Sequence, residues 1–192
     1  MTEQIRISAG IGGSLSLEFA NTAAWHLSHE PVERLQTWPD VVTWAGEQGL
    51  IEGDQMTALS HMKIEVERVH ALREAIFRIG LAVARGDDPD ESDLKAVVQR
   101  ASGALPAPIW SGKSLRWRFD QAIAPSSLLE LVARDFVALL VSERASKLRL
   151  CAGPDCGWLF IDESRSKPRR WCSMSDCGNR SKARRAYARR KD

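Results

Sequence analysis

The stretch CAGPDCGWLFIDESRSKPRRWCSMSDCGNR, residues 151–180, contains all four cysteines of this 192-residue chain. Their spacing, C-x4-C-x15-C-x4-C, falls within the range of structural zinc ribbons and fingers. Four thiolates at about 2.3 Å complete a tetrahedral zinc shell, which leaves no position for a catalytic water. We therefore predict one structural Zn²⁺ per chain. Its predicted ligands are Cys151, Cys156, Cys172 and Cys177.

The alternatives for these cysteines are disulfides, buried free thiols and an iron–sulfur cluster. The first 22 residues lack the basic and long apolar regions of a signal peptide. No apolar run approaches the roughly 20 residues that cross a bilayer, so we expect no membrane association. The expected location is the cytoplasm, where thiols stay reduced and paired cysteines favour metal over disulfides. An iron–sulfur cluster stays open as the rarer metal alternative.

The sequence around the cysteines predicts a treble-clef-like finger over residues 147–192. The apolar run at 158–161 is typical of a short strand, and Arg170-Trp171 provides an expected return strand. Cys177 then opens a helix rich in Ala and Arg, whose N-terminus favours a thiolate. Such a small segment has little core of its own, so bound metal would supply much of its folding energy.

Charge is distributed very unevenly along the chain. Residues 147–192 contain 13 of the 27 Lys and Arg but only 5 of the 25 Asp and Glu, a net +8 against −6 for residues 1–146. This pattern favours a polyanionic partner for the tail, with docking of the tail on the acidic body as the alternative. The residues that we expect to neutralise phosphates are Arg180, Lys182, Arg184, Arg185 and Arg189.

Residues 1–146 are predicted to form a mostly helical domain. Apolar residues at steps of three and four predict helices over 56–85, over 91–101 and from Pro125 onward. Alternation around a Gly-Lys turn predicts a β-hairpin over 109–119, and the alternation of Leu15, Leu17 and Phe19 predicts a strand. The expected fold class of the chain is therefore α+β, mostly α-helical, with a small antiparallel sheet and a C-terminal finger.

The helical domain carries little sign of catalytic chemistry. It contains no Gly-rich phosphate loop, nucleophile elbow or HExxH, so we do not expect an enzyme. One polar stretch could line a ligand pocket, although a core strand followed by a capped helix is the favoured explanation of it. The residues of this candidate pocket are Glu18, Asn21, Thr22, Trp25 and His26.

Two motifs together resemble a known family. RRWCSMSDCGNRSK at 169–182, with FIDESR at 160–165 upstream, resembles the signature of the bacterial CGNR zinc-finger family. In that family the finger follows a domain called ABATE, and LSLEFANT at 15–22 looks like its opening motif, with Glu18 where Asp is more usual. The resemblance implies a stress-induced transcription regulator whose four cysteines bind zinc and whose last helix contacts DNA.

Three functions follow from these observations. The first is a DNA-binding transcription regulator, which would gain affinity and specificity as a homodimer because a single finger reads few base pairs. The second is an RNA- or ribosome-binding protein, in which Trp171 and Tyr187 stack on unpaired bases. The third is a domain that binds a small-molecule effector, with the finger as a structural element.

Overall fold

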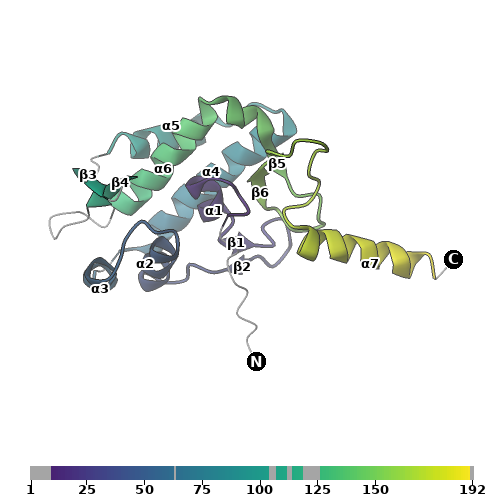
Figure 1. The fold of residues 1–192 in the computed structure, drawn as a ribbon, viewed down its shortest axis with the longest axis horizontal. Coiled ribbons are helices and arrows are strands. Elements are labelled where there is room, and N and C mark those ends of the chain that lie inside the picture. The colour runs from purple at the N-terminus through teal and green to yellow at the C-terminus, as the bar shows by residue number, and fades with distance from the viewer. Residues whose placement is uncertain (1–9, 63, 104–106, 112–113, 119–125, 191–192) are drawn as a thin grey trace.

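The computed structural model describes residues 10–62, 64–103, 107–111, 114–118 and 126–190 (Figure 1). Within these ranges the chain forms seven α-helices and three two-stranded antiparallel sheets. This confirms the predicted α+β, mostly helical class. The α-helices are α1 (Leu15–Ala20), α2 (Trp38–Glu47), α3 (Asp54–Ser60), α4 (Val66–Arg85), α5 (Glu91–Ala101), α6 (Ser127–Leu140) and α7 (Asn179–Ala188). The strands are β1 (Ala23–Ala24), β2 (Val32–Glu33), β3 (Ala107–Ser111), β4 (Ser114–Arg118), β5 (Leu148–Leu150) and β6 (Leu159–Ile161).

The core of the helical domain forms around α4 and α6. The helix α5 and the short helix α1 each pack against both of them. The inward face of α4 presents Val69, Ile76 and Ile79, all fully buried, because apolar residues recur every three or four positions. Gly86, with φ of +81°, then ends α4 in the left-handed conformation that glycine adopts without strain. No described helix is long and apolar enough to cross a membrane.

The helix predicted over 56–85 is divided into α3 and α4, so that prediction was wrong at its N-terminal end. The carbonyl of Leu59 accepts hydrogen bonds from the indole Nε1 of Trp38 at 2.7 Å and from the Met62 N–H at 3.1 Å. The bond from Met62 to Leu59 spans three residues instead of the four of an α-helix, so a tight turn ends α3 here. This tertiary contact with α2 redirects the chain, although the apolar spacing runs on through the break.

The strand predicted at Leu15–Phe19 was also wrong, because residues 15–20 form α1. The Ser14 hydroxyl caps the helix by accepting a hydrogen bond from the Leu17 N–H at 3.3 Å. Five of the six residues of α1 are buried, which means that the helix has no polar face. Alternating polarity could not identify the element, since polar and apolar residues alike lie inside the protein.

The C-terminal segment begins with the β5–β6 hairpin. Arg149 of β5 pairs with Phe160 of β6, so the expected return strand at Arg170-Trp171 was wrong. Leu148 and Leu159 belong to the same apolar core as α4 and α6, because both are buried against it. After the hairpin, the π-helical turn η2 (Met174–Gly178) leads into α7, which points away from the rest of the molecule (Figure 1).

The remaining helices and the other hairpin agree with the sequence predictions. The helix α5 begins at Glu91, where the Asp90 carboxylate caps it by accepting from the Ser92 and Asp93 N–H groups. The strands β3 and β4 pair in an antiparallel hairpin, as predicted. The helix α6 begins at Ser127, and the expected start at Pro125 lies outside the described residues.

Candidate metal centre and basic helix

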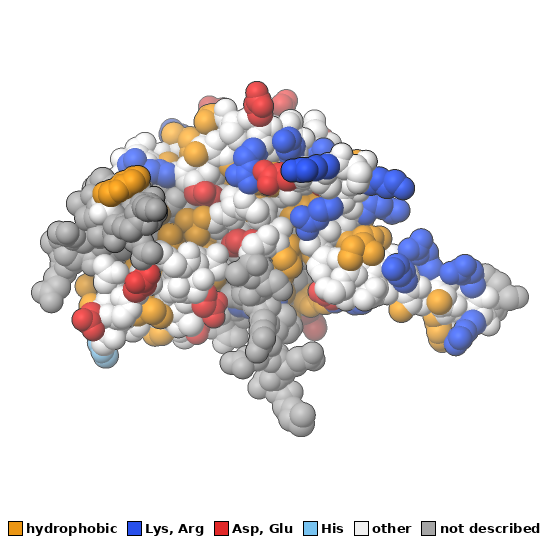
Figure 2. Space-filling model, viewed as in Figure 1, with side chains coloured by type: hydrophobic (Ala, Val, Ile, Leu, Met, Phe, Trp, Pro, Cys, Tyr) orange, Lys and Arg blue, Asp and Glu red, His pale blue; other side chains and the backbone are white. Residues whose placement is uncertain are grey.

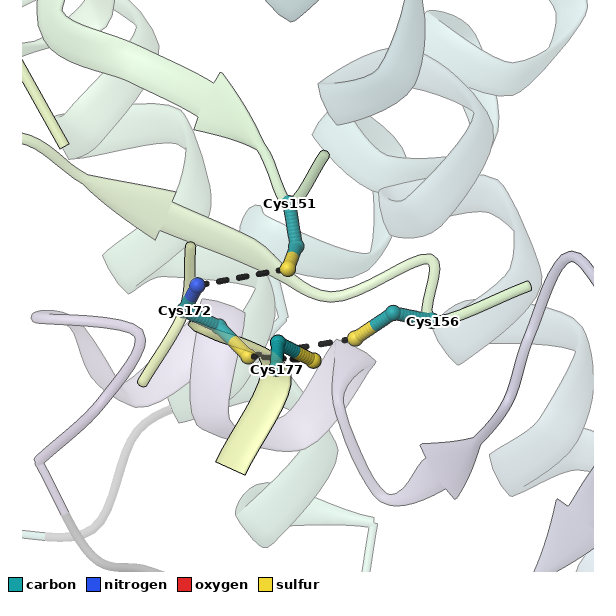
Figure 3. A group of neighbouring side chains, drawn as sticks. All are labelled: Cys151, Cys156, Cys172 and Cys177. Atoms are coloured by element: carbon teal, nitrogen blue, oxygen red, sulfur yellow. Dashed lines mark hydrogen bonds between the residues drawn. The ribbon is translucent and has the colours of Figure 1, made fainter. Parts of the chain in front are cut away.

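The four cysteine side chains converge in one buried cluster (Figure 3). Their Sγ atoms all lie within 4.8 Å of one another. The Sγ atom of Cys172 lies 3.8 Å from that of Cys156 and 3.7 Å from that of Cys177. A tetrahedron with metal–sulfur bonds of about 2.3 Å has edges of about 3.8 Å. The cluster therefore has the size and donor set to hold one metal ion.

Two loops bring the cysteines together. The first loop joins β5 to β6 and carries Cys151 and Cys156; it turns through Asp155 and Gly157, whose φ angles are +62° and +69°. The second pair lies just before α7, with Cys177 inside η2. Gly153 is enclosed by the cluster, since a Cβ atom there would lie 3.0 Å from the Cys177 Sγ. A glycine at this position therefore leaves room for the sulfur atoms of the cluster.

Hydrogen bonds from nitrogen stabilise negative charge on two of the sulfur atoms. The backbone N–H groups of Gly153 and Cys172 donate to the Cys151 Sγ at 3.4 and 3.3 Å. The guanidinium Nη2 of Arg180 donates to the Cys177 Sγ at 2.9 Å. Charge-assisted bonds of this kind favour thiolate over thiol, which is the form that binds metal.

The thiols also influence one another's ionisation. Hydrogen bonds from Cys156 and then Cys172 lower the pKa of Cys151. The same interaction with Cys151 raises the pKa of Cys156 and of Cys172, and burial raises both further. Among these three thiols, the protein groups alone therefore favour the thiolate at Cys151. A bound cation would be needed to hold all four sulfurs deprotonated.

The helix α7 differs from every other α-helix described in having no buried residue. Residues 179–190 contain six Lys and Arg and no acidic residue. Figure 2 shows these basic side chains along the projecting helix, with further ones on the adjoining part of the finger. Of the predicted phosphate-binding residues, four are exposed and one is half-buried. The exposed ones are Lys182, Arg184, Arg185 and Arg189, and the half-buried one is Arg180.

The residues of the predicted ligand pocket follow one another from α1 to the loop after β1, and several of their polar atoms bond to the protein, whereas the buried Nδ1 of His26 has no hydrogen-bond partner among the described residues. Glu18 accepts a hydrogen bond from the Gly12 N–H at 2.6 Å, and burial raises the pKa of Glu18 despite backbone hydrogen bonds that lower it. Thr22 donates to the Phe19 carbonyl at 2.7 Å. A pocket for a ligand at these residues stays a prediction.

Three of these residues connect the helical domain to the finger. The Asn21 amide donates to the Leu159 carbonyl and accepts from the Leu159 N–H, both at 2.9 Å. The ring of Trp25 lies under the guanidinium of Arg180, with 4.2 Å between the Arg180 Cζ and the ring centroid. The His26 N–H donates to the Cys156 carbonyl at 3.3 Å. Asn21, Trp25 and His26 were predicted as residues of a ligand pocket, and their contacts lie at this junction.

The side chain of His26 also belongs to a polar cluster between α4 and β2. Its Nε2 atom lies 2.8 Å from the Glu74 carboxylate, and its ring stacks on Phe77 at 3.6 Å. Arg73 bridges Glu74 and Glu33, contacting both carboxylate oxygens of Glu33 at 2.6 Å. Sequence reasoning missed Glu33, Arg73 and Glu74, because nothing in the local pattern joins residues 40 positions apart.

These features define a helical protein that carries a C-terminal four-cysteine metal-binding finger with an exposed basic helix. Residues 13–143 match the family model of ABATE, described as "Putative stress-induced transcription regulator". Residues 147–190 match the CGNR zinc finger. The chain therefore belongs to the ABATE family, with a CGNR zinc finger after the ABATE region, as its motifs predicted. No curated protein matches the chain.

Proposed function

We propose that this protein is a transcription regulator that binds duplex DNA through α7, held in place by a structural Zn²⁺ bound to the four cysteines. The observation that carries the proposal is the exposure of α7, which has six Lys and Arg in residues 179–190, no acidic residue and no buried face. A solvated helix of this charge attracts phosphates strongly. The family description of a transcription regulator supports the same reading.

The dimensions of α7 suit a DNA groove. Ten helical residues extend about 15 Å, and the major groove of B-DNA is about 12 Å wide. The finger is only the base from which the helix projects, so α7 can approach the duplex without the helical domain in between (Figure 1). The mechanism we propose is release of counterions as Lys and Arg side chains replace them at the phosphates.

Zinc fits this role through the chemistry of its donors. Four buried cysteine sulfurs fill a tetrahedral shell and match the softness of Zn²⁺, as is typical of structural sites. When bound, the ion would bridge the β5–β6 loop and the start of α7, so that the helix has a fixed base. Its loss should release that base without a direct effect on the basic side chains.

A salt titration tests the proposal. The logarithm of the affinity for a duplex should fall linearly with the logarithm of salt concentration, with a slope that reflects the number of phosphates contacted. Lys182→Gln and Arg185→Gln should each make that slope shallower by about 0.9. Lys95→Gln and Arg85→Gln remove the same charges from exposed positions on α5 and α4, and should leave the slope unchanged. A flat salt response, or no binding at low salt, would refute DNA binding.

A second candidate, binding to single-stranded RNA, is favoured by one observation. The side chain of Tyr187 on α7 is 64% exposed, and an exposed ring among arginines can stack on an unpaired base. Competition between a duplex DNA and a single-stranded RNA of equal charge separates the candidates. Tighter binding to the RNA, lost in Tyr187→Ala, would replace the DNA assignment.

Two further parts of the proposal concern the helical domain. We propose that the helical domain binds a small-molecule effector. We also propose that the protein acts as a homodimer, since one short helix contacts too few base pairs for a specific site. Sedimentation at working concentrations measures the second part directly. A monomer both free and on DNA would rule the dimer out.

A further inference from the structure

Arg180, the arginine of the CGNR motif, makes three contacts at once inside the protein. Its Nη2 donates to the Cys177 Sγ at 2.9 Å, and its Nη1 lies 2.8 Å from the Asp176 carboxylate. The guanidinium also lies over the ring of Trp25, with the Cζ atom 4.2 Å from the centroid. These contacts engage both terminal nitrogens of the guanidinium, so a phosphate would compete for them with Asp176 and the Cys177 Sγ, while 38% of the Arg180 side chain stays exposed.

The Trp25 partner belongs to a loop that also contacts the first cysteine loop. Trp25 has φ of +57°, a left-handed conformation that a non-glycine residue adopts only when its surroundings hold it there. The next residue, His26, donates its N–H to the carbonyl of Cys156 at 3.3 Å. Gly157 lies so close that a Cβ atom on it would come within 2.7 Å of the His26 Cβ. The chain at 25–26 thus contacts both the first cysteine loop and the first turn of α7.

A second arginine–tryptophan pair crosses the same junction in the opposite direction. Arg34, which follows β2, lies over the ring of Trp158 at the end of the first cysteine loop, 5.5 Å from its centroid. Each side of the junction therefore contributes one tryptophan and one arginine to these two pairs. Both pairs favour one placement of the finger against the helical domain, because a cation–π attraction requires each guanidinium to stay over its ring.

The position of Arg180 also divides α7 into two faces. At 100° per residue, the direction opposite Arg180 is presented by Lys182, Arg185 and Arg189, which lie about 200°, 140° and 180° around the helix. All three are exposed. In the first turn, the side of the helix that carries Arg180 is directed to Trp25, whereas the opposite side faces solvent along its whole length.

We propose that Arg180 is a positioning residue: it joins the metal centre to Trp25 and thereby fixes the direction in which α7 leaves the finger. The face with Lys182, Arg185 and Arg189 is then the one presented to nucleic acid. This assignment of faces rests on the proposed function, whereas the link from Cys177 through Arg180 to Trp25 does not. The proposal removes Arg180 from the set of residues predicted to bind phosphates.

The link is tested on the cobalt-substituted protein, whose thiolate-to-cobalt absorption reports on hydrogen bonds to sulfur. In Arg180→Gln, loss of the bond to Cys177 should shift this band to longer wavelength, because the thiolate electrons are held less tightly. Arg184→Gln removes an equal, exposed charge one turn away and should leave the band in place. Arg180→Lys should resemble the Gln variant, since an ammonium cannot span Cys177, Asp176 and Trp25 together.

Amide hydrogen exchange tests the connection to the helical domain. Arg180→Gln and Trp25→Leu should each accelerate exchange severalfold in residues 23–28 and in the first turn of α7. Trp25→Leu should do so without shifting the cobalt band, because the bond to sulfur stays intact. If Arg180→Gln fails to retain metal, Trp25→Leu and Arg180→Lys are compared instead. A wild-type band and wild-type exchange in the arginine variants would overturn the proposal.

The salt titration tests the assignment of faces. Arg180→Gln should leave the slope for duplex DNA unchanged even if affinity falls, whereas Arg189→Gln should reduce it by about 0.9. A slope reduced by about one in Arg180→Gln, with the cobalt band and exchange unchanged, would make Arg180 a phosphate contact and overturn the proposal. If no variant binds DNA, the proposed function fails, and the band and exchange data still decide the role of Arg180.

Discussion

The side chain of Asn21 is expected to contribute more to stability than any surface hydrogen bond of the protein. In the β5–β6 hairpin, the N–H and C=O groups of Leu159 point away from β5, and the Asn21 amide satisfies both at 2.9 Å. Asn21 is 2% exposed and Leu159 is 0% exposed, so water cannot readily replace the amide. Asn21→Ala would leave two buried backbone groups without partners, each of which costs about 1–3 kcal/mol.

We expect Asn21→Ala to lower the free energy of unfolding by about 3 kcal/mol, which corresponds to a fall in Tm of roughly 6–12 °C for a chain of this length. Urea unfolding of the zinc-loaded protein, followed by circular dichroism, measures the change. Asn179→Ala removes an exposed amide that donates to the Ser175 carbonyl at 3.1 Å, and should cost less than about 1 kcal/mol. A loss below 1 kcal/mol in Asn21→Ala would refute the reasoning, because the Leu159 backbone would then have found other partners.

Three other outcomes follow from the structure. Burial raises the pKa of Glu33, but hydrogen bonds from Arg73 and the Leu35 N–H and the charge of Arg73 outweigh it, so the pKa is lowered overall. The stability that the Glu33–Arg73 ion pair contributes should be fully present at neutral pH and lost as pH falls below about 4.5. Glu33→Gln should flatten that part of the acid-unfolding curve. Gly153→Ala should weaken metal binding roughly ten- to hundredfold in a chelator competition, since its Cβ would lie 3.0 Å from the Cys177 Sγ. Metal removal should abolish the circular dichroism signal of α7 while that of the helical domain persists, and an unchanged spectrum would contradict a structural role for the metal.

The parts of the fold that could be predicted are those that local sequence determines. The cysteine cluster could be predicted because the spacing of the four cysteines is typical of two chelating loops. The helix α5 begins and ends at the predicted residues because its N-cap and its periodic apolar face are both local features of the sequence. The charge pattern left open whether the basic helix is exposed or docked on the acidic body, and the structure shows it without a buried residue. Local pattern thus identified the four cysteines that converge in one cluster and the basic helix that we propose as the nucleic-acid surface.

The parts that could not be predicted depend on contacts between distant residues. Leu15 to Ala20 form a helix inside the core, where no side faces solvent and alternation loses its meaning. The break after Leu59 depends on a hydrogen bond from Trp38, 21 residues earlier. Asn21 and Leu159 are 138 residues apart, so no sequence window contains both partners.

The sharing of one apolar core by the hairpin and the helices has a thermodynamic consequence. Leu148 and Leu159 are buried with the residues of α4 and α6, so the finger cannot lose its structure without exposing core surface of the helical domain. Metal binding and the folding of that domain are therefore linked equilibria. Suppose that an effector binds the helical domain and stabilises its packing against this hairpin. Such an effector would raise the affinity of the cysteines for metal, and bound metal would raise the affinity for the effector by the same factor.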